Sequence, residues 1–160
     1  MRQVNPEHIN ALLQLVSSGP FLKLLGMRVR ELGPGYSKVE VDLERKHYNP
    51  FGVIHGGVYS SLIDTAAYWA LYCELEEGKG FTTLDLSVSH LSMIREGKVI
   101  AEGKSIRTGQ SICLAEASVK DSTGRLLAHG TSKIMILNGK QSIEHAIEAM
   151  GHQPLPPKFL

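Results

Sequence analysis

The segment from residue 56 to about residue 75 constrains the fold of this chain more than any other. Its residues suit a helix, and apolar side chains such as Val58, Leu62 and Ile63 occupy most of its sides. A helix that is apolar nearly all round is a buried helix. Other elements of the chain must therefore wrap around it, and we expect this helix to form the centre of the core.

Segments suited to β-strands lie on both sides of this helix in the sequence. Residues 36–43 alternate Val39, Val41 and Leu43 with charged residues, as in a strand with one buried face. Strands are also expected at 27–33, 81–92, 98–108, 111–121 and 126–137, mostly joined by short turns. The sequence therefore predicts an α+β fold in which an antiparallel sheet of about six strands wraps one long helix.

The two ends of the chain are expected to add smaller elements. A helix is predicted over residues 6–16, because Asn5 can cap it and Pro6 suits its first position. Residues 141–160 are predicted to form a short helix at 143–150 and a Pro-rich tail, which we expect to be a surface appendage without chemistry.

The length of the chain suits one domain. A chain of 160 residues can bury a core of ordinary size without dividing. We therefore expect residues 1–160 to form a single domain whose core spans about residues 20–137.

The start of the long helix carries groups that suggest chemistry. His55 is followed by Gly56 and Gly57, and N–H groups in the first turn of a helix have no partner within it. Because the glycines carry no side chains, these N–H groups can approach a carbonyl oxygen closely, as in an oxyanion hole. Asp64 follows inside the apolar run, where an ionised side chain usually has a functional reason.

The complete pattern resembles the hotdog-fold acyl-CoA thioesterases, and among them the PaaI-like group associated with phenylacetate breakdown. The family signature is an Asn, a Gly three residues later, His-Gly-Gly and an Asp on the following helix. These residues are present here as Asn49, Gly52, His55, Gly56, Gly57 and Asp64. The resemblance spans roughly residues 20–137. It implies the hotdog fold and hydrolysis of an acyl-CoA to a free acid and CoA.

The resemblance also implies roles for these residues. Asp64 would activate water as a general base or attack the thioester as a nucleophile, and the sequence leaves both open. The Gly56 N–H would polarise the thioester carbonyl, and His55 would orient the loop or contact the substrate. Asn49 would lie near the thioester and the attacking water. Thr83, on the strand after the helix, would assist the carboxylate.

Two further segments are expected to bind the CoA part of the substrate. In the family, the loop after the third strand holds the pantetheine, and a later hairpin holds the nucleotide phosphates. Guanidinium groups suit phosphate oxygens, so one arginine in each segment is a candidate, with an ordinary solvated arginine as the alternative. The predicted binding residues are Gly57, Arg95, Gly97, Arg107, Thr108 and Ser111.

The spacing along the helix predicts a site shared between subunits. Asp64 lies nine residues after His55, which is about 13 Å along a helix axis. One thioester carbonyl cannot reach both positions in the same chain. Asn49, His55 and Gly56 of one chain would therefore meet Asp64 and Thr83 of its mate. A homodimer with two equivalent sites follows, and the resemblance suggests that such dimers pair into a homotetramer.

Composition excludes several other classes of protein. The formal net charge of +1 offers no basic excess for nucleic acid, and no apolar run approaches the ~20 residues of a membrane span. With no signal peptide at the N-terminus, we expect a cytoplasmic protein. Cys73 and Cys113 fit no disulfide or metal motif and are expected to be reduced and buried. The histidines lack ligand spacing, so neither a metal nor a cofactor is expected beyond the CoA of the substrate.

Two other functions stay open. The first is a non-catalytic acyl-CoA-binding module on the same scaffold. Such a module would be expected to carry an added DNA-binding segment or to lack the acid, whereas Asp64 is present. A hotdog hydratase or dehydratase would need a longer His-to-acid spacing and a Pro-rich step in place of Gly56 and Gly57. The acyl group is open between small aromatic and short- or medium-chain aliphatic types.

Overall fold

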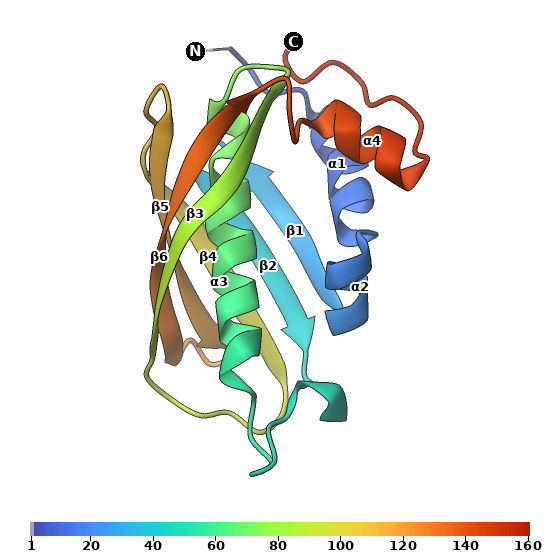
Figure 1. Cartoon of the computed structure of the whole chain (residues 1–160). Helices are drawn as coiled ribbons and strands as arrows, with labels where there is room; N and C mark the ends of the chain where they lie inside the picture. The colour runs from blue at the N-terminus through green and yellow to red at the C-terminus, as the bar shows by residue number, and fades with distance from the viewer. Residues whose placement is uncertain (1) are drawn as a thin grey trace.

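The computed structural model describes residues 2–160 as one six-stranded antiparallel sheet with a long helix packed against it (Figure 1). The strand order is β1-β2-β4-β5-β6-β3, and the long helix α3 contacts all six strands. This arrangement confirms the predicted α+β hotdog fold. The elements are α1 (Pro6–Ser17), α2 (Pro20–Leu25), β1 (Met27–Gly33), β2 (Tyr36–Asp42), η1 (Arg45–His47), α3 (Gly56–Ala70), η2 (Tyr72–Glu74), β3 (Lys79–His90), β4 (Lys98–Arg107), β5 (Ile112–Asp121), β6 (Leu126–Asn138) and α4 (Ile143–Met150).

Two helix boundaries differ from the sequence expectation. The long helix ends at Ala70 rather than near residue 75, because the chain then tightens into the 3₁₀ helix η2 while Leu71 and Tyr72 stay buried. The apolar pattern therefore continues past the end of the α-helix. The short helix α2 was not predicted. The first helix ends at Ser17, one residue beyond its predicted end, and Pro20 then begins α2, since a proline at the first helical position gives up no hydrogen bond.

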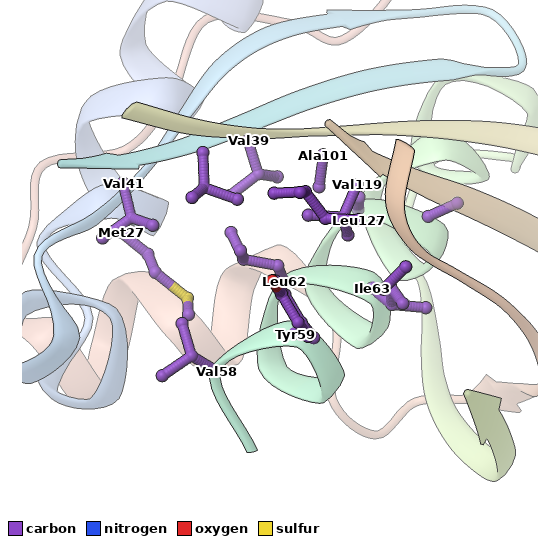
Figure 2. Close-up of a cluster of buried hydrophobic side chains, with 14 of the residues drawn as sticks. Met27, Val39, Val41, Val58, Tyr59, Leu62, Ile63, Ala101, Val119 and Leu127 are labelled. Atoms are coloured by element: carbon purple, nitrogen blue, oxygen red, sulfur yellow. The ribbon is translucent and has the colours of Figure 1, made fainter. Parts of the chain in front are cut away.

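The core lies between α3 and the concave face of the sheet. Figure 2 shows Leu62 and Ile63 of α3 among Val39, Ala101 and Val119, which come from β2, β4 and β5. All five side chains are fully buried. The nearly all-round apolar character of the helix thus reflects strands that cover it on several sides.

The backbone of α3 approaches the sheet closely at Gly103 of β4. A Cβ atom at Gly103 would lie 2.1 Å from the Ala66 carbonyl oxygen, so only glycine fits this position. The buried hydroxyl of Ser37 on β2 donates a hydrogen bond to the same oxygen at 2.6 Å. These contacts fix the middle of α3 against the sheet, two residues after Asp64.

The C-terminal tail is packed into the structure, so the expectation of a surface appendage is wrong. Lys158 is only 2% exposed, and its Nζ donates hydrogen bonds to the carbonyl oxygens of Tyr72 and Leu75 just after α3. The Lys158 carbonyl accepts a hydrogen bond from the Asn5 N–H at 2.9 Å. Burial lowers the pKa of Lys158 to about 8. The tail therefore links the N-terminus to the end of the central helix.

Two further expectations concern the chain as a whole. Both cysteines are buried and unpaired, as predicted, and burial raises the pKa of Cys73 to about 11. A thiol with so high a pKa stays protonated at neutral pH and is a poor nucleophile. Among residues 2–160, no helix has the length and apolar character needed to cross a membrane.

The Gly103 contact predicts a specific loss of stability. Gly103→Ala should lower the free energy of unfolding by about 1–3 kcal/mol, because the added methyl group forces the backbone of α3 away from β4. Urea unfolding followed by circular dichroism measures this change. Gly33→Ala is the matched control, since a Cβ at Gly33 meets no atom within 4 Å. Equal effects of the two substitutions would contradict this account of the helix–sheet contact.

Candidate active site

His55 caps the start of α3 and determines which N–H groups remain available there. Its ring Nδ1 accepts a hydrogen bond from the Gly57 N–H at 2.8 Å, and its carbonyl accepts one from the Val58 N–H. The neutral ring therefore carries its proton on Nε2. The Gly56 N–H has no acceptor among the described residues. This geometry leaves Gly56, rather than Gly57, as the free donor at the positive end of the helix.

Asn49 shapes the loop that leads into the helix. Its side-chain oxygen accepts hydrogen bonds from the N–H groups of Phe51 at 2.9 Å and Val53 at 3.3 Å. Gly52 completes this turn with a φ of +74°, a conformation that favours glycine. The side-chain NH₂ of Asn49 has no hydrogen-bond partner within residues 2–160. Asn49 thus builds the turn with its oxygen and keeps its amide donor available.

A surface groove of about 570 Å³ brings Asn49 and Gly56 together. Its wall also contains Tyr59, His90 and Arg125, and neither His90 nor Arg125 was assigned a functional role from the sequence. The His90 ring lies directly over Gly56, since a Cβ there would be 2.5 Å from His90 Cε1. His90 ends β3, far from the signature motif in sequence, so no local pattern marked it.

The tyrosine in this wall is a structural group rather than a base. The Tyr59 hydroxyl donates a hydrogen bond to the Ser92 carbonyl oxygen at 2.9 Å, which ties α3 to the loop after β3. Burial raises the pKa of Tyr59 to about 12, so its hydroxyl stays protonated in the neutral range. The Tyr59 ring also packs edge-on against His90, with ring centroids 5.7 Å apart.

Asp64 and Thr83 form the second part of the candidate site. Thr83 Oγ1 on β3 donates a hydrogen bond to Asp64 Oδ1 on α3 at 2.8 Å. Both residues are half-buried, so the carboxylate is supported by the strand without being sealed from solvent. Tyr68 lies one helical turn further on, and burial together with the charge of Asp64 raises its pKa above the usual range. Tyr68 therefore stays neutral beside the acid.

The two parts of the site are not joined within one chain. Among the described residues, neither Asp64 nor Thr83 lines the groove that contains Asn49 and Gly56. Asp64 lies eight residues after Gly56 on the continuous helix, which is about 12 Å along the axis. The chain thus carries the predicted electrophile-binding half, with Gly56, and the predicted acid half, with Asp64, at different heights of one rigid helix.

The predicted CoA-binding residues also divide between the two ends of the molecule. Arg95 is exposed in the loop before β4, close to Gly52 at the start of α3. Gly97 closes this loop with a φ of +99°, and its carbonyl accepts the Leu43 N–H at 2.9 Å. The β4–β5 hairpin, which carries the other candidates, lies at the opposite end of the sheet (Figure 1).

Two of the three hairpin candidates, Arg107 and Thr108, line a second and larger hollow. Arg107 and Thr108 border a cavity of about 790 Å³ beyond the end of α3, together with Glu74. The Thr108 hydroxyl donates a hydrogen bond to the Glu74 carboxylate. Ser111 is exposed, and its carbonyl accepts the Ile136 N–H at 2.8 Å. One chain therefore does not bring Arg95 and Arg107 together.

The described residues contain no cluster of three or more His, Cys, Asp or Glu side chains that could hold a metal ion.

Comparison with known proteins gives the class. A sequence profile described as the thioesterase superfamily matches residues 51–128. A proposed esterase of Archaeoglobus fulgidus is 32% identical over 117 residues, which cover 72% of this chain and 74% of that protein. Acyl-coenzyme A thioesterase 13 of Homo sapiens is 29% identical over 114 residues, covering 69% and 80% of the two chains. The crystal structure of a thioesterase from Haemophilus influenzae superposes with a TM-score of 0.79 at 26% identity, covering 88% of this chain and 97% of that one.

The chain belongs to the thioesterase superfamily and is a thioester hydrolase with the hotdog fold. This confirms the resemblance to the PaaI-like group that was based on the Asn49–Asp64 motif. The individual roles assigned to site residues stay predictions.

The hydrogen bond from Thr83 to Asp64 gives the first test of the acid half. Thr83→Val removes the hydroxyl but keeps the shape, and should lower kcat at least about tenfold, since a hydrogen bond to a charged group is worth about 1.5–3 kcal/mol. Thr83→Ser should retain most of the rate. Thr82→Val, one residue earlier on β3, is the control for loss of a hydroxyl on this strand. If Thr83→Val keeps the full rate, Thr83 does not assist the acid.

Proposed function

We propose that this protein hydrolyses acyl-CoA thioesters to a free acid and CoA. The observation that carries the proposal is the free Gly56 N–H at the start of the same helix that bears the Thr83-supported Asp64. The name of the human relative, acyl-coenzyme A thioesterase 13, supports CoA as the thiol. Tyr59, Leu91 and Met93 give the groove an apolar lining, which suits a small aromatic or a short- to medium-chain acyl group.

The reaction adds water across the C–S bond of the thioester. In one form, Asp64 accepts a proton from water while the water oxygen bonds to the carbonyl carbon. In the other form, the Asp64 carboxylate bonds to that carbon and releases the thiolate, and water then hydrolyses the mixed anhydride. In both, the carbonyl oxygen becomes an oxyanion that the Gly56 N–H stabilises, and the C–S electron pair leaves with CoA, which takes up a proton.

The sheet offers an edge through which two chains can complete this site. β3 is the last strand of the sheet, runs from Lys79 to His90, and exposes half of the Leu84 side chain. A long unpaired edge strand is a template for pairing with another chain. Thr83 lies near the start of β3 beside Asp64, and His90 lies at its end over Gly56.

Two-fold symmetry turns these contacts into a complete site. If β3 pairs antiparallel with β3 of a second copy about a centre between Leu86 and Ser87, Thr83 comes opposite the partner's His90. Asp64 then lies next to the partner's Gly56, and the same contacts repeat on the other side of the axis. We therefore propose a homodimer with two shared sites. Pairing of dimers into a tetramer is not required by this geometry.

The acid is tested by an isosteric change. Asp64→Asn keeps the shape and still accepts the Thr83 hydrogen bond but cannot act as base or nucleophile, so kcat should fall by at least about 10². The assay is thiol release from phenylacetyl-, hydroxybenzoyl- and hexanoyl-CoA. Glu148→Gln on the exposed face of α4 is the control for loss of one carboxylate. Near-normal turnover by Asp64→Asn would remove Asp64 from the mechanism.

The shared site is tested by complementation between two inactive variants. Asn49→Asp preserves the oxygen that holds the turn but replaces the free amide donor, and Asp64→Asn removes the acid. In a mixed dimer, one site carries both changes and the other carries neither. Random equal mixing makes about half of the dimers mixed, so about a quarter of all sites should recover wild-type turnover.

The measurement is thioester hydrolysis after the two variants are unfolded and refolded together, compared with each variant refolded alone. A mixture no more active than the average of its parents would show that each site is built within one chain.

A further inference from the structure

The larger cavity, beyond the end of α3, is built partly from the two ends of the chain. Besides Arg107 and Thr108 on the β4–β5 hairpin, its wall includes Arg2 and Phe159. Both of these terminal residues lie outside residues 51–128, the part matched by the superfamily profile. They also lie outside the Asn49–Asp64 motif.

Several hydrogen bonds and a buried lysine hold this terminal wall in place. Val4 and Phe159 form an antiparallel bridge, and the Leu160 N–H donates to the Gln3 carbonyl oxygen at 3.0 Å. Lys158 is buried against η2, and its hydrogen bonds to the carbonyl oxygens of Tyr72 and Leu75 hold the C-terminal segment there. The position of Phe159 is thus fixed by the fold on both sides of the residue.

The groups in this cavity match the parts of a phosphorylated nucleotide. Arg2 and Arg107 supply two guanidinium groups for phosphate oxygens, and the Arg2 guanidinium carbon lies 5.8 Å from the Phe159 ring centroid. The Phe159 ring offers a flat apolar surface for a base, and the half-exposed Ile106 adds an aliphatic contact. Glu74 supplies a carboxylate acceptor for an amino group on that base. A volume of about 790 Å³ is in the range of small-molecule sites.

We infer that Arg2 and Phe159 bind the adenine nucleotide at the end of the CoA substrate and determine selectivity for CoA thioesters over thioesters that lack it. This inference rests on the proposed acyl-CoA hydrolysis. The distance between the acid and this cavity suits such a substrate. Asp64 and Glu74 are ten residues apart along α3 and η2, which is about 15–20 Å and of the order of the length of the pantetheine arm. Arg107 keeps its predicted phosphate role, and the chain ends form the opposite wall.

The first experiment measures nucleotide binding without hydrolysis. Titration calorimetry with adenosine 3′,5′-bisphosphate should show binding to the wild type, and Arg2→Ala and Phe159→Ala should each weaken it by about five- to tenfold. Phe159→Tyr keeps the ring and should bind like the wild type. The matched controls are Arg45→Ala on η1 and Phe21→Ala on α2, both exposed and at the other end of the sheet. No binding by the wild type, or equal binding by all variants, overturns the inference.

The second experiment separates this inference from the proposed function. With hexanoyl-CoA, Arg2→Ala and Phe159→Ala should raise KM about five- to tenfold and leave kcat unchanged, because the nucleotide is bound equally before and during reaction. With hexanoyl-pantetheine, which lacks the nucleotide, the variants should match the wild type. If KM rises equally for both thioesters, the terminal wall has only a structural role.

Hydrolysis of the thioester and binding of the nucleotide can be lost separately. Asp64→Asn should abolish hydrolysis of both thioesters while leaving bisphosphate binding intact. If the wild type hydrolyses hexanoyl-pantetheine and hexanoyl-CoA with the same kcat/KM, the protein is a thioesterase and the nucleotide inference is wrong. If the wild type binds the bisphosphate but hydrolyses no acyl-CoA in the panel, the proposed function is wrong.

Discussion

The close contact between the backbones of Ala66 and Gly103 is the constraint on which the rest of this structure depends. It brings α3 so near to β4 that no side chain fits between them, and the Ser37 hydroxyl binds the same carbonyl oxygen from β2. Because protein interiors are close-packed, a helix held in this way cannot slide or turn without disturbing the core. Asp64 lies two residues before the contact, so its height along the sheet and its direction toward β3 are determined there. The helix is a rigid support for the acid.

The same rigidity separates the two halves of the site. An α-helix rises about 1.5 Å per residue, so the N–H of Gly56 and the carboxylate of Asp64 cannot meet on one thioester. His55 contributes to this arrangement, since its ring and carbonyl take up the N–H groups of Gly57 and Val58 and leave the Gly56 N–H free. The proposed two-fold axis at the β3 edge would resolve the separation, because it would exchange the ends of β3 and bring each half to the complementary half of the second chain. In this view the dimer is part of the catalytic apparatus.

Local patterns predicted the elements of this fold well, and long-range contacts account for what they missed. Alternation placed the strands to within one or two residues, and the motif placed Asn49 and Gly56 in one groove. The start of α2 was missed because a proline after Gly19 ends one helix and begins another equally well. Lys158 was missed because its partners are backbone carbonyls, which leave no trace in a sequence pattern. His90 was missed for a related reason, since its place over Gly56 depends on how β3 ends and not on neighbouring residues.

Selectivity in this enzyme has to come from groups other than the Gly56 N–H and the Asp64 carboxylate. In the proposed mechanism, the Gly56 N–H and the Asp64 carboxylate act on the thioester link that every acyl-CoA shares, so they cannot distinguish one acyl group from another. The side chains that surround the thioester can distinguish acyl groups. In the groove these side chains are Tyr59, His90 and Met93, which come from α3, the end of β3 and the loop after it. The terminal wall around Phe159 lies beyond the other end of α3, where only the thiol part of a substrate could extend. In the proposed shared site, the acyl group would lie in the groove of one chain and the nucleotide of the thiol at the terminal wall of the chain that supplies Asp64. The residues that contact these two parts of the substrate could then change without moving Asp64 or the Gly56 N–H.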